Sequence, residues 1–265
     1  MYSFTYHRPE SLRAALGLLE TSQDAKILAG GQTLLPTMKQ RLASPANIVD
    51  LDKIPGLAEI KSDANGLVIG AMARHADVAA SSVVAETIPA LAELAGGIGD
   101  PAVRHRGTIG GSIANNDPAA DYPAACLALG ATIVTNKRRV AADDFFVGLF
   151  ETSLENDEIV TEVTFPKPDK AAYEKFRNPA SRYAIVGVFV AKKGGSVRVA
   201  VTGAGSNGVF RVSRFEDALK ADFNPRALEG LSVDSAELNT DIHADADYRA
   251  HLINVMARRA VAAAR

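Results

Sequence analysis

The chain has 265 residues, of which 47% are hydrophobic, and its formal net charge at pH 7 is −2. A chain of this length can bury a substantial core in one to three domains, and its weakly acidic balance excludes the basic surface that nucleic-acid binding requires. No apolar run reaches the roughly 18 residues of a membrane span, and the single cysteine excludes an internal disulfide and a four-cysteine iron–sulfur cluster.

The N-terminal region predicts a small α/β unit that ends near residue 55. Leucines at helical spacing predict a helix over 11–20, and Lys26-Ile27-Leu28 predicts a short strand. A glycine turn over 29–33 leads from this strand to Leu34-Leu35-Pro36, which is typical of a helix start. Residues 47–51 predict a second strand.

The next region extends to a boundary marked by Pro166 and Pro168 and predicts a second, mixed unit. We expect a hairpin from residues 57–60 and 67–70, because Asn65-Gly66 suits a type I′ turn. Further helices are predicted over 76–84, 88–94 and 122–129, and strands over 132–134 and 159–165, with a loop region around Phe145 and Phe146 between those strands.

The remaining residues predict a separate C-terminal unit. Strands are expected at 173–177, 185–190 and 197–202, and helices at 215–220 and 249–264. Alternation along the first of these strands places Tyr173, Lys175 and Arg177 on one face. That face is either a charged sheet edge or part of a cleft.

Two glycine turns, Ala29-Gly30-Gly31-Gln32-Thr33 and Thr108-Ile109-Gly110-Gly111-Ser112, are the strongest functional signal. A Gly-Gly pair lets backbone N–H groups approach an anion without an intervening Cβ. Either pair alone is typical of an ordinary turn, but the repeat of one local pattern predicts a divided site for a diphosphate. Neither turn matches the dinucleotide-binding G-x-G-x-x-G or the P-loop motif.

Other polar segments leave alternatives open. Residues 114–123 could bond a ribose, a ribityl chain or a flavin edge, or could be a simple turn. Arg104, His105 and Arg106 could meet a phosphate or form a solvated loop face. The histidines lack metal-site spacing, so we expect no metal, and the apolar surroundings of Cys126 predict a buried structural thiol.

Six segments, spread over nearly the whole chain, carry a resemblance: Tyr6-His7-Arg8-Pro9, Ala29-Gly30-Gly31-Gln32-Thr33-Leu34-Leu35-Pro36, Val68-Ile69-Gly70-Ala71-Met72, Gly107-Thr108-Ile109-Gly110-Gly111-Ser112, Asp117-Pro118-Ala119-Ala120-Asp121 and Arg182-Tyr183-Ala184-Ile185-Val186. Together they resemble the FAD-binding medium subunit of molybdenum hydroxylases, such as the carbon monoxide dehydrogenase medium subunit. The resemblance implies an α+β protein with a vanillyl-alcohol-oxidase-type fold. Its expected parts are two α/β FAD-binding subdomains, 1–55 and 56–168, and a C-terminal α+β domain, 169–265.

The resemblance also implies non-covalently bound FAD and neither a catalytic residue nor a metal site. The two glycine turns would hold the diphosphate, Ile98 would pack near the adenine or flavin, and Tyr183 would lie close to the isoalloxazine. Asp121 would bond the cofactor, and Lys175 would reach the cleft. The full implied set is Ala29, Gly30, Gly31, Gln32, Thr33, Leu34, Ile98, Thr108, Ile109, Gly110, Gly111, Ser112, Asp121, Val160, Lys175 and Tyr183.

The implied function is electron transfer in an oxidoreductase complex. Electrons would arrive from a small iron–sulfur subunit, after substrate oxidation in a large molybdopterin subunit, and would leave through FAD to an external acceptor. A dimer of heterotrimers is the implied assembly, and the absence of an apolar signal core at the N-terminus predicts a cytoplasmic protein. Two alternatives stay open: a stand-alone flavin oxidase or dehydrogenase acting on a small molecule, and a scaffold or sensor without cofactor.

Overall fold

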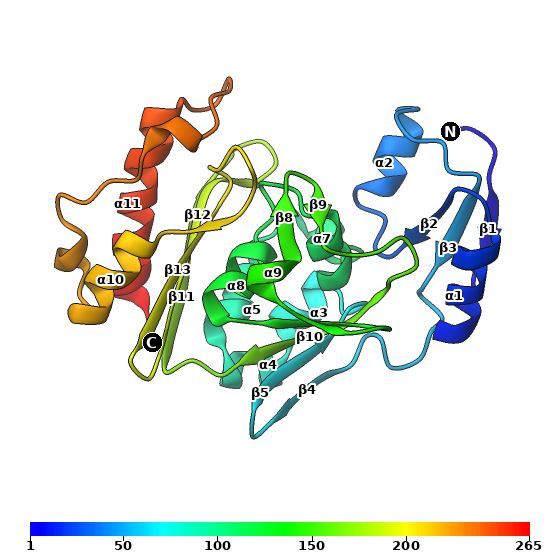
Figure 1. Ribbon diagram of the computed structural model, residues 1–265, viewed down its shortest axis with the longest axis horizontal. Helices are drawn as coiled ribbons and strands as arrows, with labels where there is room; N and C mark the ends of the chain where they lie inside the picture. The colour runs from blue at the N-terminus through cyan, green and yellow to red at the C-terminus, as the bar shows by residue number, and fades with distance from the viewer.

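The computed structural model describes residues 1–265 and arranges them as three adjoining units along one axis (Figure 1). The N-terminal unit lies at one end, a middle unit rich in short helices lies at the centre, and the C-terminal unit lies at the other end. Each unit contains its own β-sheet, and a two-stranded hairpin adds a fourth, small sheet to the middle unit.

The N-terminal unit is a parallel three-stranded sheet with the strand order β1-β3-β2. Its strands are β1 (Thr5–His7), β2 (Ala25–Leu28) and β3 (Asn47–Asp50), and its helices are α1 (Leu12–Thr21) and α2 (Leu34–Lys39). The hydroxyl of Ser11 caps α1 by accepting a hydrogen bond from the Ala14 amide at 3.2 Å. The helices and strands predicted for this unit are therefore confirmed.

The middle unit is built on an antiparallel five-stranded sheet with the order β4-β5-β10-β6-β7. Its strands are β4 (Ile60–Asp63), β5 (Gly66–Gly70), β6 (Thr132–Thr135), β7 (Arg139–Ala141) and β10 (Val160–Pro166), and the small hairpin is β8 (Phe146–Gly148) with β9 (Glu151–Thr152). Its helices are α3 (His75–Ala80), α4 (Ser82–Thr87), α5 (Pro89–Gly96), α6 (Pro101–Arg104), α7 (Ile109–Asn115), α8 (Tyr122–Leu129) and α9 (Ala142–Phe145).

Several local predictions for the middle unit are wrong in detail. The first hairpin strand begins at Ile60 instead of residue 57, and Asn65 has a negative φ, so the turn is not type I′. Instead, the Asp63 carboxylate accepts hydrogen bonds from the amides of Asn65 at 2.7 Å and Gly66 at 3.1 Å. The helix expected over 76–84 divides at Ser81, whose hydroxyl caps α4.

Two other segments are more ordered than predicted. The region around Phe145 and Phe146, expected as a loop, contains α9 and the β8–β9 hairpin. The second glycine segment is not a free turn, because Ile109 to Ser112 form the first turn of α7 with Thr108 as its cap. Its conformation is therefore set by helix formation as well as by glycine.

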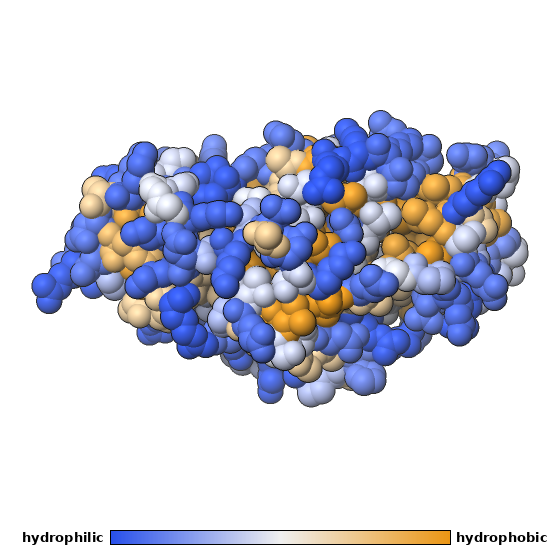
Figure 2. Space-filling view, turned by 90° about the horizontal axis from the view of Figure 1, so that it is seen from below, coloured by the Kyte–Doolittle hydropathy of each residue, from blue (hydrophilic) through white to orange (hydrophobic).

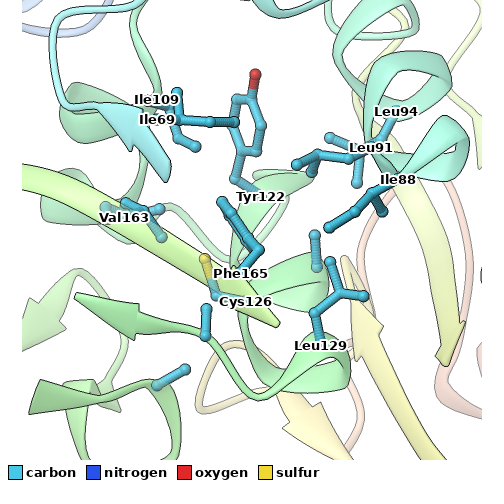
Figure 3. Close-up of a cluster of buried hydrophobic side chains, with 14 of the residues drawn as sticks. Ile69, Ile88, Leu91, Leu94, Ile109, Tyr122, Cys126, Leu129, Val163 and Phe165 are labelled. Carbon is cyan, nitrogen blue, oxygen red and sulfur yellow. The ribbon is translucent and has the colours of Figure 1, made fainter. Parts of the chain in front are cut away.

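Helix α8 lies at the centre of the largest hydrophobic cluster, and all eight of its residues are buried. Figure 3 shows Tyr122 and Cys126 of this helix beside Val163 and Phe165 of β10. Burial raises the pKa of the Cys126 thiol far above its usual value, which keeps it protonated. The prediction of a buried structural thiol is confirmed.

The C-terminal unit is an antiparallel sheet with the order β11-β12-β13-β14, which lies between helices of two units. Its strands are β11 (Lys170–Arg177), β12 (Ala184–Lys193), β13 (Ser196–Thr202) and β14 (Phe210–Arg211), and its helices are α10 (Ser213–Ala221), α11 (Ala246–Ala263) and the 3₁₀ turns Pro225–Leu228 and Ser235–Glu237. Helices α10 and α11 lie on the side of the sheet away from the middle unit (Figure 1), while α5 and α8 pack on the sheet from the middle unit. The first eight residues of β12 are buried as a result.

None of the helices combines the length and the apolar character needed to cross a bilayer. On the face drawn in Figure 2, hydrophilic residues cover most of the surface, and hydrophobic residues emerge in separate patches, one of them towards the N-terminal unit at the right.

Candidate functional site

A cavity of about 1010 Å³ lies between the N-terminal unit and the middle unit. Both glycine segments line it, the first from the loop between β2 and α2 and the second from the start of α7. The two segments whose repeated pattern predicts a shared ligand therefore lie together in the structure.

The first glycine segment packs against the second and against Arg106 and Gly107, the two residues just before it. A Cβ added at Gly30 would lie 2.2 Å from the carbonyl oxygen of Arg106 and 2.6 Å from the Cα of Gly107, while one added at Gly111 would lie 3.4 Å from the Cβ of Ala29. Only glycine at position 30 allows this backbone contact. Any other residue would place its Cβ 2.2 Å from the Arg106 oxygen, and Cβ atoms in proteins essentially never lie within 3.0 Å of another group.

The first glycine segment presents a row of free hydrogen-bond donors. The main-chain amides of Ala29, Gly30, Gly31, Gln32 and Thr33 donate no hydrogen bond within the protein. Gly31 has a φ of +70°, a left-handed conformation that favours glycine. Successive amides with a left-handed residue among them form a concavity that binds anions.

The second segment differs, because four of its five main-chain amides, all except that of Thr108, already donate hydrogen bonds within the protein. The amides of Ile109 and Gly110 donate to the carbonyls of Ala73 at 3.1 Å and Ala71 at 2.8 Å. Those of Gly111 and Ser112 donate to the side chain and the carbonyl of Thr108. The expectation of bare amides in both segments is thus wrong for the second, which contributes close packing and the Ser112 side chain to the cavity.

Most of the implied binding residues surround the cavity. The lining includes Ala29, Gly30, Gly31, Gln32, Thr33, Leu34, Thr108, Gly110, Gly111, Ser112 and Val160. Ile109 points instead into the hydrophobic cluster of the middle unit. Ile98, Asp121, Lys175 and Tyr183 are also outside the lining.

Asp121 and Lys175 form a buried ion pair between the start of α8 and strand β11. The Lys175 Nζ lies 2.9 Å from Asp121 Oδ1 and donates to the Gly97 carbonyl at 2.9 Å, and the Tyr173 hydroxyl donates to the same carboxylate. Burial raises the pKa of Asp121, against the lowering by Lys175. The face of β11 that carries Tyr173 and Lys175 is thus an interior contact between two units.

Sequence reasoning missed several cavity-lining side chains, among them His75, Phe150 and Glu158. Burial, together with the nearby Arg104 charge, lowers the pKa of His75 to about 4, so its imidazole is neutral at pH 7. A single histidine in a helical pattern carries no signal for this position, since its environment is assembled from distant segments. The His, Cys, Asp and Glu side chains form no group of three or more that could hold a metal ion.

Glu158 holds the rim of the cavity through a cluster of hydrogen bonds. Its carboxylate accepts from Arg138 Nε at 2.9 Å, from the Thr135 hydroxyl at 2.7 Å and from the Glu155 amide at 3.0 Å. The bonds from Arg138, opposed by partial desolvation, lower the pKa of Glu158 to about 2.

We expect Glu158→Gln to weaken the acid dependence of stability. Because the pKa is about 2 in the folded chain and ordinarily 4.5, the stabilising effect of this group is complete above pH 4.5 and is lost as pH falls towards 2. Urea unfolding at several pH values over this window should give a flatter profile for the variant. Glu229→Gln, at a carboxylate whose side chain is 57% exposed, is the control and should follow the wild type. Parallel profiles for Glu158→Gln and wild type would contradict the assignment.

Known proteins of one family are similar to this chain over nearly its whole length. Residues 2–168 match the family model described as the FAD binding domain in molybdopterin dehydrogenase. The chain is 37% identical to the nicotine 6-hydroxylase medium subunit of Paenarthrobacter nicotinovorans, covering 97% of this chain and 95% of that one. It is also 37% identical to the carbon monoxide dehydrogenase medium chain of Hydrogenophaga pseudoflava, covering 98% and 96%.

Solved structures show the same similarity. A chain of carbon monoxide dehydrogenase from Hydrogenophaga pseudoflava superposes with a TM-score of 0.88 at 36% identity, covering 99% of this chain and 97% of that one. A chain of quinoline 2-oxidoreductase from Pseudomonas putida 86 superposes with a TM-score of 0.87 at 31% identity, covering 99% and 96%.

Proposed function

The chain belongs to the family of FAD-binding medium subunits of molybdenum hydroxylases, and we propose that it passes electrons from the iron–sulfur clusters of a partner subunit to an external acceptor. The comparisons confirm the family resemblance, the α+β fold, FAD as the cofactor and the class of molybdopterin-dependent oxidoreductases. The electron path, the partners and the individual binding residues are our proposals.

The cavity of about 1010 Å³, with both glycine segments in its wall, supports the proposal that it holds the dinucleotide with its central diphosphate. The proposal depends mainly on one observation: residues 29–33 line the cavity, and none of their main-chain amides donates a hydrogen bond within the protein. These amides would hold the diphosphate, with Leu34, Ser112 and Val160 as further contacts. When bound, FAD supplies the capacity to accept and release electrons, while the protein supplies binding and orientation.

The other implied residues have different support. Asp121 and Lys175 form an ion pair with each other, and Lys175 also donates a hydrogen bond to the carbonyl of Gly97, the residue before Ile98. Asp121, Lys175 and Ile98 therefore lie together between the middle and C-terminal units. On the family resemblance, Ile98, Asp121 and Lys175 remain proposed cofactor contacts, and Tyr183 remains the residue proposed to lie close to the isoalloxazine. Ile109 is proposed to position its neighbours from the core.

The chain's own composition supports a dependence on partners. Its single cysteine cannot hold an iron–sulfur cluster of four cysteine ligands, so an iron–sulfur donor of single electrons would have to be held by another chain. We propose a small iron–sulfur subunit and a large molybdopterin subunit, in a dimer of heterotrimers, because relatives are described as medium subunits or chains. The boundaries 1–55, 56–168 and 169–265, supported by the separate sheets, and the cytoplasmic location are part of the proposal.

The test is to tag the full chain in its native host and purify its complex. We expect copurifying chains that contain iron and molybdenum, and a yellow flavin that acid precipitation releases from the complex. The purified chain loaded with FAD should keep its flavin absorbance when small-molecule substrates of the complex are added, and should lose it when the reduced iron–sulfur partner is added. A chain that purifies alone, or whose flavin is bleached directly by a small substrate, would favour a stand-alone flavin enzyme and overturn the proposal.

A further inference from the structure

His75 lies behind the junction of the two glycine segments. It begins helix α3, and its main-chain amide donates to the carbonyl of Gly107 at 2.9 Å, next to a β-bridge between Arg74 and Thr108. The residue is only 5% exposed, and it lines the same cavity as the glycine segments. Its backbone and its ring are therefore both fixed against the second segment.

The ring nitrogens of His75 have different surroundings. Nδ1 is buried and has no hydrogen-bond partner. Nε2 faces Gly107, where an added Cβ would lie 2.5 Å away, and Gly107 in turn touches Gly30. Gly107 therefore lies between the His75 ring and Gly30 of the first segment.

The protonation state of His75 follows from these surroundings. Burial and the Arg104 charge keep the imidazole neutral at pH 7, and Arg104 itself is held in place by the carbonyls of Ile98 and Gly99. A buried N–H without an acceptor is rarer in proteins than an acceptor without a donor. The single ring proton therefore belongs on Nε2, which leaves the lone pair on the unpartnered Nδ1.

We infer that His75 is a further binding residue of this site, whose neutral Nε2–H donates a hydrogen bond to a diphosphate oxygen of the bound dinucleotide. The inference rests on the proposed position of the diphosphate at the glycine segments. An uncharged donor suits this position, since the neighbouring donors of the first segment are also uncharged main-chain amides. No hydrogen bond within the chain uses either ring nitrogen of His75, so the Nε2–H is available to a ligand in the cavity that this residue lines.

The test compares variants of the full, FAD-free chain in titrations with FAD. His75→Leu should raise the Kd for FAD about tenfold, which corresponds to about 1.4 kcal/mol, and should raise the Kd for ADP-ribose, which has the diphosphate but no isoalloxazine, by a similar factor. His75→Gln, whose amide nitrogen can replace Nε2, should keep most of the affinity. His105→Leu, at the neighbouring exposed histidine outside the cavity, is the matched control and should bind FAD as the wild type does.

Two outcomes of these titrations would overturn the role of His75, and one would overturn the FAD site as a whole. An unchanged Kd for FAD in His75→Leu overturns the inference while leaving the FAD site intact, and so does a loss confined to FAD with ADP-ribose unaffected. Failure of the wild-type chain to bind FAD overturns the site as a whole. Where His75→Leu does not fold, ¹⁵N-histidine NMR of the wild type decides: the Nε2 signal of His75 should be protonated and should shift on addition of FAD, and an unmoved signal overturns the inference.

Discussion

Gly30→Ala should weaken FAD binding roughly 100-fold, or by about 2.8 kcal/mol. The added methyl group would lie 2.2 Å from the Arg106 carbonyl oxygen and 2.6 Å from Gly107, so the two segments must move apart. That movement displaces the free amides of the first segment from the wall formed by the second. Fluorescence titration of the FAD-free chain measures the Kd.

Gly17→Ala is the matched control for this prediction. Gly17 lies within α1, and an added Cβ there meets nothing within 4 Å. The variant should bind FAD normally and gain up to about 1 kcal/mol of stability, because alanine favours helix over glycine. If Gly30→Ala bound FAD as tightly as Gly17→Ala, the contact between the two segments would have no part in the site.

Lys175→Met should destabilise the fold by about 3–5 kcal/mol, because it leaves a buried carboxylate without its cation. The side chains of Lys175 and Asp121 are only 2% and 4% exposed, so water cannot replace the lost charge. The effect should shrink as the pH falls, since a protonated Asp121 no longer needs a cation and burial already raises its pKa. Urea unfolding at pH 7 and at lower pH tests both expectations.

Arg258→Met provides the control pair for Lys175→Met. Arg258 pairs with Glu229 at 3.0 Å, but the two side chains are 42% and 57% exposed. Exposed ion pairs contribute about 0–1 kcal/mol, so this variant should unfold almost as the wild type does. Equal stability losses in the two variants would show that the Asp121–Lys175 pair does not stabilise the contact between the middle and C-terminal units.

The two glycine segments have different tasks in the folded chain, although their sequences look alike. The first lies in a loop, where its amides have no internal partners. The second begins a helix, and Gly110 is required because a Cβ there would lie 2.5 Å from the Cβ of Ala71. The first segment has main-chain donors without partners in the protein, and the second packs against it in the cavity wall.

Local residue patterns were enough to predict many of the helices and strands and to recognise the family. Apolar spacing placed α1 and α11, and the glycine pairs marked segments that line the cavity, because both signals depend on residues close together in the chain. The recognisable segments carried the α+β fold and FAD, which the comparisons confirm.

Which polar groups are paired and which are free depends on how distant segments pack in the folded chain. The Gly110 amide is occupied by Ala71, and Lys175 is bound to a carboxylate 54 residues away. His75 acquires its burial and lowered pKa from surroundings that include Gly107, Arg104 and Tyr122. Hydrogen-bond partners, burial and protonation depend on segments that are distant in the chain and adjacent in space, so local patterns of residues could not reveal them.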